Sequence, residues 1–134
     1  RRWEPDDADF VLDLYSRWEV QRFIGNPPRV MAERHEAEER IHAWQHMDHP
    51  VHGIWAVQLK DGPDSNTLAG SLLLKDIPAS GSSMRLQPSG DTEIGWHFHP
   101  DVWGRGYATE AAKAVLAYAF RSGLPKVVAV TAPA

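Results

Sequence analysis

The feature that most constrains the fold is a run of four elements over residues 92–131: a strand, a glycine-rich turn, a helix and a second strand. Residues 92–98 alternate apolar side chains with others, which is the period of a half-buried strand. Small and apolar residues then recur at helical spacing, at Ala108, Ala111, Ala112, Val115, Leu116, Ala119 and Phe120. Residues 126–131 form a short apolar run, which predicts a buried strand parallel to the one at 92–98. The sequence therefore predicts an α/β fold.

Two further helices are predicted in the N-terminal third of the chain. Apolar residues at helical spacing behind Pro5 indicate a helix over residues 7–18. A narrow apolar stripe among dense charges indicates a second, surface helix over residues 32–47. The segment between them, residues 19–31, contains a glycine and two adjacent prolines, so we expect an irregular connection there.

The middle of the chain predicts a β-hairpin. Residues 54–59 and 68–75 have the composition of strands, and the turn-forming residues 60–66 separate them. We therefore expect these two strands to pair in antiparallel fashion. Residues 78–90 are rich in serine, glycine and proline and show no periodicity, which predicts a mobile loop before the strand at 92–98.

The composition excludes several classes of function. The 134 residues suit one compact domain and include no cysteine, which rules out thiolate nucleophiles, iron–sulfur clusters and cysteine-based zinc sites. The net charge of −4 argues against a nucleic-acid partner. No apolar run approaches the ~20 residues that span a bilayer, so we expect a soluble cytoplasmic protein without a membrane partner. Because the chain starts at Arg1 and stops at Ala134 just after an apolar run, we also expect it to be a fragment of a longer product.

Seven histidines raise the question of a metal site. His42 and His46 are four residues apart on the predicted helix, and His49 and His52 follow closely. No His-Glu-x-x-His pattern and no neighbouring carboxylate cluster accompany them, and a solvated helix end explains these residues equally well. The sequence therefore predicts no metal site.

The glycine-rich turn is a candidate site for an anion. Gly104 and Gly106 leave the main chain open to close approach, and the helix that begins there presents unpaired N–H groups. Arg105 can add a charge-assisted contact. An ordinary tight turn before a helix is the alternative explanation. A nucleotide-binding P-loop would need Gly-Lys-Ser/Thr, and a dinucleotide fingerprint would need a third glycine where Thr109 stands.

This turn resembles the coenzyme-binding motif of GNAT acetyltransferases, whose pattern is Gln/Arg-x-x-Gly-x-Gly/Ala. Gly106 and Ala108 match the pattern, Trp103 stands at its first position, and the likeness extends over nearly the whole chain. It is greatest to the branch that includes the ribosomal-protein-alanine N-acetyltransferases. The resemblance implies a mixed, mostly antiparallel sheet with helices on both faces, splayed open at the coenzyme site. It also implies a single domain, 1–134, that lacks its C-terminal helix and last strands.

By the same resemblance, acetyl-coenzyme A is the expected cosubstrate. It is expected to transfer its acetyl group to a primary amine, either a protein N-terminus or a small molecule. A homodimer would also fit. The residues implied in coenzyme binding are Trp96, His97, Phe98, Trp103, Gly104, Arg105, Gly106, Tyr107, Ala108 and Thr109. A noncatalytic module that binds acyl-coenzyme A or a protein partner is the alternative function.

The catalytic candidates are Glu93 and His97. Glu93 shares a strand face with Gly95, whose bare backbone is expected to leave space for the substrate. His97 points the same way and can relay a proton through water, but about 13 Å of extended strand separates it from Glu93. An exposed strand glutamate and a packing histidine are the alternatives. The general acid is expected beyond Ala134.

Overall fold

The computed structural model describes residues 1–24, 27–60, 66–78 and 88–129. The helices in this part of the chain are η1 (Pro5–Asp7), α1 (Ala8–Ser16), α2 (Trp18–Gln21), α3 (Arg34–Gln45), η2 (Pro100–Val102) and α4 (Tyr107–Arg121). The strands are β1 (Gly53–Gln58), β2 (Leu68–Pro78), β3 (Pro88–Phe98) and β4 (Val128–Ala129).

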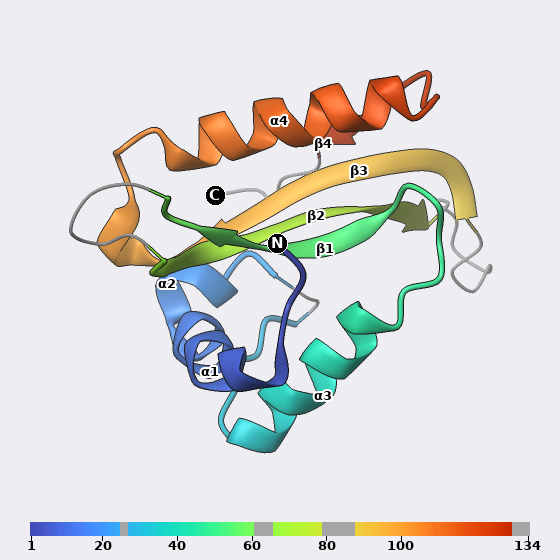
Figure 1. Cartoon of the computed structure of the whole chain (residues 1–134). Coiled ribbons are helices and arrows are strands. Elements are labelled where there is room, and N and C mark those ends of the chain that lie inside the picture. The colour runs from blue at the N-terminus through green and yellow to red at the C-terminus, as the bar shows by residue number, and fades with distance from the viewer. Residues whose placement is uncertain (25–26, 61–65, 79–87, 130–134) are drawn as a thin grey trace.

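The four strands form one sheet in the order β1-β2-β3-β4. β1 pairs with β2 and β2 pairs with β3 in antiparallel fashion, whereas β3 and β4 are parallel. Helix α4 covers one face of the sheet, and α1 and α3 cover the other (Figure 1). The predicted α/β fold, with a mixed and mostly antiparallel sheet and helices on both faces, is therefore confirmed.

The strand register assigns each side chain of β3 to one face of the sheet. Ile94 packs with Ala112 and Ala119 of α4 in one apolar cluster, so the even-numbered residues of this segment face α4. His97 contacts Tyr15 of α1, so the odd-numbered residues face the first helices. This alternation agrees with the faces predicted from the sequence.

Two apolar layers, one on each side of the sheet, stabilise the fold. The layer beneath the first helices contains the fully buried residues Ala8, Val11, Leu14, Ala37 and Ile41 together with Trp3. The layer beneath α4 is built from Leu72, Leu74 and Ile94 against the alanines of that helix. Because alanine is small, α4 can lie close to the sheet along its length.

The structure differs from the sequence predictions in two places. A short helix, α2, interrupts the segment that was predicted to be irregular, and Val20 is buried there and anchors it. β2 and β3 also extend into the segment predicted to be a loop, because their pairing continues to Pro78 opposite Pro88. Main-chain hydrogen bonds between strands do not require alternating side chains, so the sequence pattern missed these ends. The rest of that loop prediction, residues 79–87, lies outside the described residues.

Helix α3 begins with a carboxylate that is held by backbone amides. Glu36 Oε2 accepts hydrogen bonds from the N–H groups of Ala32, at 2.7 Å, and Glu33, at 2.9 Å. Glu36 Oε1 lies 2.7 Å from Arg29. The two amides, followed by Arg29, lower the pKa of Glu36 from 4.5 to about 2. This carboxylate therefore stabilises the native state above its ordinary pKa and loses that effect as the pH falls towards 2.

We expect Glu36→Gln to lower the free energy of unfolding at neutral pH, because the amide lacks the charge that the N-terminus of α3 favours. The difference from the wild type should shrink below about pH 4.5 and disappear near pH 2, where the native carboxylate is protonated. Urea unfolding over a pH series measures this difference. Glu39→Gln, on the same helix, is the control. A difference that stays constant across the series would contradict the assignment.

Candidate functional site

The turn between β3 and α4 has the left-handed backbone that glycine favours. Gly104 has a φ of +78° and Gly106 has a φ of +82°. A Cβ atom at either position would meet no other atom within 4 Å, so packing does not require glycine there. The two glycines therefore allow the left-handed backbone of this turn and leave open space in front of the main chain.

The amides of the first turn of α4 face this open space. The first bond of the helix runs from the Glu110 N–H to the Gly106 carbonyl, at 3.1 Å. The preceding N–H groups have no acceptor within the helix, and no side chain caps the helix at Gly106. No other hydrogen bond within the described residues engages the N–H groups of residues 107–109. Because these amides lie at the positive end of a 15-residue helix, their chemistry suits an anionic group.

Side chains of the turn anchor it to the rest of the fold. His99 Nδ1 accepts a hydrogen bond from the Asp101 N–H, so its Nε2 carries the proton and donates it to Asp13 Oδ2 at 2.7 Å. Burial acts to raise the pKa of Asp13, but the hydrogen bonds from His99 and Arg17 outweigh it and hold that pKa below its ordinary value. The turn is therefore fastened directly to helix α1, which carries Asp13.

The carboxyl-terminal half of β3 has an open main-chain edge. The His99 N–H donates to the Ala69 carbonyl of β2, and peptide groups alternate in direction along a strand. The N–H groups of Trp96 and Phe98 therefore point away from β2, where β4 pairs only with Glu93 and Ile94 in the described part of the chain. A ligand that follows this edge can accept hydrogen bonds from both amides.

The main-chain groups of His97 and the carbonyl of Phe98 are not available at this edge. The peptide groups of His97 point towards β2, because they share the direction of those of His99. The Phe98 carbonyl accepts a hydrogen bond from Trp103 Nε1 at 2.7 Å. Only the amides of Trp96 and Phe98 and the carbonyl of Trp96 remain, so His97 has no main-chain group free to bind a ligand at this edge.

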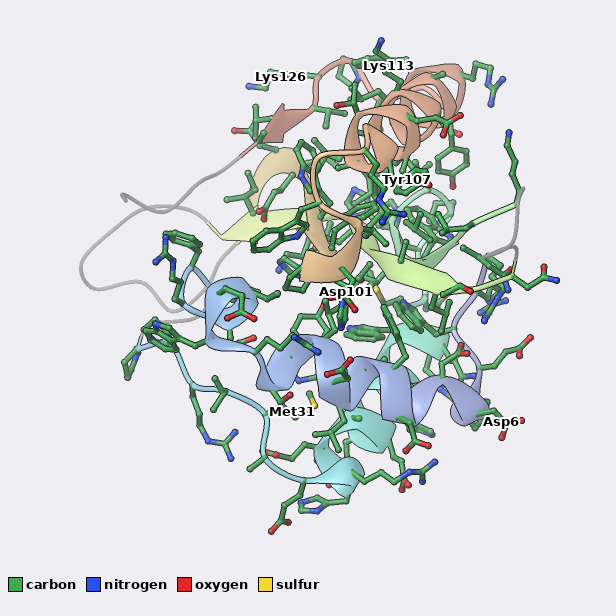
Figure 2. The ribbon with its side chains drawn as sticks, turned by 90° about the vertical axis from the view of Figure 1, so that its left-hand side faces the viewer. Asp6, Met31, Asp101, Tyr107, Lys113 and Lys126 are labelled. Carbon is green, nitrogen blue, oxygen red and sulfur yellow. The ribbon has the colours of Figure 1, made fainter. Side chains whose placement is uncertain are left out.

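The remaining residues of the predicted turn site divide into two groups. Tyr107 and Ala108 pack against the buried cluster of Leu59, Ala69 and Phe98, so they belong to the core. The exposed residues are Trp103, Gly104, Arg105, Gly106 and Thr109. Figure 2 shows Asp101 and Tyr107 in successive parts of the segment that rises from the sheet to α4.

A cavity of about 300 Å³ lies on the opposite face of the sheet, beneath the first helices. Tyr15, Ser71, Leu73 and His97 are among the residues that line it. The Oγ atom of Ser71 is buried and has no hydrogen-bond partner within the described residues. This cavity therefore offers an unsatisfied polar atom on the β2 residue that pairs with His97.

The polar pair in this cavity is uncharged at neutral pH. The Tyr15 hydroxyl lies 2.8 Å from His97 Nδ1, and their rings meet edge to face. Burial, assisted by the charge of Lys75, lowers the pKa of His97 from 6.5 to about 4. Burial also raises the pKa of Tyr15 to about 12. The site therefore holds a neutral imidazole beside a protonated phenol.

The structure separates the two predicted catalytic residues. His97 lines the cavity, whereas Glu93 is half-buried and does not. A Cβ atom at Gly95 would lie 3.0 Å from the Leu73 side chain, so that side chain, rather than a substrate, fills the space above the glycine. The expectation that Gly95 leaves space for a substrate beside Glu93 is therefore wrong, because Leu73 of the neighbouring strand lies there.

The histidines near α3 have structural partners. The rings of His42 and His46 stack, and so do those of His49 and His52. The buried His52 bonds to Thr92 through Nε2, at 2.9 Å. No group of three or more potential ligands that could hold a metal ion occurs in residues 1–24, 27–60, 66–78 and 88–129. None of the helices in those ranges has the length and apolar character needed to cross a membrane.

Comparison with known proteins identifies the family. The family model described as an acetyltransferase (GNAT) domain matches residues 1–134. The chain belongs to the GNAT acetyltransferase family. In this GNAT chain, the exposed glycine turn and the open edge of β3 contain residues for which the sequence resemblance implied coenzyme binding.

Several proteins described as acetyltransferases or putative acetyltransferases are similar to this chain. An acetyltransferase from Bacillus anthracis has the same fold, with a TM-score of 0.68 at 24% identity over 96% of this chain and 66% of that one. The protein yncA from Salmonella typhimurium, solved with its cofactor acetyl-CoA, gives a TM-score of 0.63 at 16% identity, with coverage of 96% and 66%. The uncharacterized N-acetyltransferase YnaD of Bacillus subtilis is 45% identical over 42 residues, which are 31% of this chain and 25% of YnaD. The chain thus spans about two thirds of the length of these solved relatives.

Sequence reasoning missed three residues of this GNAT site: Asp13, Tyr15 and His99. Asp13 contacts His99 from 86 residues away, and Tyr15 contacts His97 from 82 residues away. The helical spacing of α1 places Tyr15 on its buried face, but nothing local indicates its partner. Neither pair could be identified before the strand register was known.

Proposed function

We propose that this GNAT chain transfers an acetyl group from acetyl-coenzyme A to a primary amine of a small molecule or a protein N-terminus. The observation that carries the proposal is the set of uncapped amides at the N-terminus of α4, behind Gly106. They suit the diphosphate of the coenzyme, since phosphate groups favour such helix ends. The acetyl-CoA in the Salmonella typhimurium relative supports the same cosubstrate here.

Each part of the site would hold one part of the cosubstrate. The N–H groups of residues 107–109 would bind the diphosphate, and the exposed Arg105 would add a charge-assisted bond. The pantetheine arm would follow the open edge of β3 and accept hydrogen bonds from the amides of Trp96 and Phe98. The thioester would then lie near the boundary between that edge and the cavity that contains His97.

In the proposed reaction, the amine nitrogen attacks the thioester carbonyl carbon directly. A carbon–nitrogen bond forms, the carbon–sulfur bond breaks, and coenzyme A leaves as a thiolate that becomes protonated. The amine must lose a proton, because free amines titrate near pH ~8 at an N-terminus and near ~10.4 in lysine. An N–H group of the open edge can stabilise the charge that develops on the carbonyl oxygen.

Glu93 and His97 are assigned different roles in this proposal. With a pKa of about 4, His97 is neutral at pH 7, so it can orient the amine by a hydrogen bond but holds a proton weakly. Glu93, on the same sheet face outside the cavity, would receive the proton through solvent.

The turn sequence from Trp103 to Ala108 also supports placing the chain in the branch of the ribosomal-protein-alanine N-acetyltransferases.

The proposal is tested by ligand binding and by turnover. Coenzyme A should raise the melting temperature of the chain, and thiol should be released from acetyl-coenzyme A when an accepted amine is present. Stabilisation without thiol release from any amine would favour a noncatalytic coenzyme-binding module. If coenzyme A caused no stabilisation, both functions would be excluded.

We expect Glu93→Gln and His97→Gln to affect different kinetic constants. Glu93→Gln should lower kcat by about a hundredfold at pH 7, and the rate should recover at higher pH, where more of the amine is already neutral. His97→Gln should mainly raise the KM for the amine. Steady-state rates over a pH series distinguish the two effects. The stabilisation by coenzyme A should persist in both variants, and an unchanged kcat in Glu93→Gln would remove Glu93 from the mechanism.

A further inference from the structure

We propose that the acceptor is a small amine that also carries a carboxylate, and that Arg40 and Lys75 bind this carboxylate at the mouth of the His97 cavity. The inference rests on the proposed function and narrows its acceptor to one chemical class, of which amino acids are the simplest members. It rests on the size of the cavity, on the charges that remain unpaired in its wall, and on the effect of those charges on Tyr15 and His97.

The size of the cavity favours a small acceptor. Its volume of about 300 Å³ is at the lower end of the range for small-molecule sites, ~300–1,000 Å³. Met31, Trp44 and Ile54 give it apolar walls, and the buried Ser71 Oγ offers an unused hydrogen-bond acceptor. A compact molecule with one apolar part and one amine fits these walls.

The charges of the wall leave an excess of positive charge. Arg29 is paired with Glu36 at 2.7 Å, so those two charges cancel. Three charged residues of the wall have no ion pair or hydrogen bond from their side chains within the described residues: Glu39, Arg40 and Lys75. Lys75 also lies opposite Glu93 in the strand register without forming an ion pair with it. The side chains of Arg40, Lys75 and Glu39 are therefore available to bind a ligand.

Both cations lie close enough to affect the polar pair inside the cavity. The charge of Lys75 contributes to the lowered pKa of His97. The charge of Arg40 acts on Tyr15 by favouring the ionised phenol, against the larger effect of burial. Arg40 comes from α3 and Lys75 from β2, so the two cations approach the Tyr15–His97 pair from separate elements.

This arrangement discriminates between kinds of amine. A carboxylate between Arg40 and Lys75 gains charge-assisted hydrogen bonds, each of which can change affinity by about tenfold or more. A polyamine offers only further positive charge, which the two cations repel. The same field favours the neutral form of the acceptor's amine, which is the form that attacks. The preference should therefore be for amino acids over their amides and over polyamines.

The test compares matched acceptors with matched variants. Thiol release from acetyl-coenzyme A is measured with amino acids of graded size from alanine to tryptophan, with the carboxamide of each, and with spermidine. The variants are Arg40→Gln and Lys75→Gln. Arg34→Gln is the control, because Arg34 lies on α3 but pairs with Asp9 and Glu38 and does not line the cavity. Calorimetric titration with the N-acetylated form of each amino acid, and with the corresponding amide, measures binding independently of turnover.

We expect at least one amino acid to exceed its carboxamide by about tenfold in kcat/KM, mainly through KM. Arg40→Gln and Lys75→Gln should each remove most of that preference, and Arg34→Gln should retain it. Equal use of acids and amides, better use of spermidine, or a preference that survives both substitutions would overturn the inference. If no thiol is released but the N-acetylamino acid binds in an Arg40-dependent way, carboxylate recognition stands and only the proposed transfer fails. If neither occurs, both proposals fail.

Discussion

Gly106→Val should abolish the stabilisation of this chain by coenzyme A. Gly106 is the residue that precedes α4, and the space in front of it is open. A valine side chain would project into the place proposed for the diphosphate. The diphosphate could then no longer approach the N–H groups of the first turn of α4 closely. At a coenzyme concentration of one hundred times Kd, the wild type gains about 2.7 kcal/mol of stability, and the variant should gain almost none. Thermal unfolding with and without coenzyme A measures the loss.

The strain of a valine at Gly106 must be separated from its clash with the ligand. Its φ of +82° is unfavourable for any residue with a side chain, at a cost of about 1–2 kcal/mol. Gly123, at the other end of α4, has a φ of +99° and equally open surroundings, so Gly123→Val carries similar strain away from the site. The two variants should lose similar stability without ligand, and only Gly106→Val should lose the response. A full response in Gly106→Val would show that the coenzyme does not use this turn.

Leu14→Ala should cause a large loss of stability, about 2–5 kcal/mol. Leu14 is fully buried in α1, and the truncation leaves a cavity between the helix and its neighbours. Against the ~5–15 kcal/mol that stabilises a typical domain, such a loss depopulates the native state measurably at physiological temperature. Urea unfolding at 25 °C gives the difference in the free energy of unfolding.

Leu12→Ala is the matched control for Leu14→Ala, because it removes the same atoms from the same helix. Leu12 is only partly buried against the same cluster, so its truncation should destabilise the fold distinctly less. Equal losses in the two variants would mean that α1 packs differently from the arrangement in Figure 1.

The sequence predicted those parts of the fold that depend on local periodicity. The alternation at 92–98, the alanine-rich helix and the valine-rich run indicated β3, α4 and β4 in the right order, and the parallel pairing of β3 with β4 is confirmed. The helix α2 was missed because four residues are too few for a periodic signal. Its stability depends on burial of Val20, which is a tertiary effect.

Within the candidate site, only the glycine turn could be recognised from the sequence. Glycines between a strand and a helix carry their own signal, so the turn at Gly104 and Gly106 was evident from the sequence. The cavity on the other face combines residues from α1, α3, β2 and β3, whose meeting depends on the strand register. The space above Gly95 was misjudged for the same reason, because Leu73 becomes its neighbour only after β2 and β3 pair.

Helix α1 contacts both sides of the site through residues only two positions apart. Asp13 bonds to His99 at the start of the glycine turn, and Tyr15 contacts His97, which lines the cavity. A shift of α1 that improves the fit of one ligand must therefore displace a group that serves the other. We expect the binding of the two ligands to be coupled, and thermodynamic reciprocity requires each to change the affinity of the other by the same factor. A substitution that shifts this helix should consequently alter both dissociation constants, so acceptor choice and acetyl-donor affinity are linked through α1.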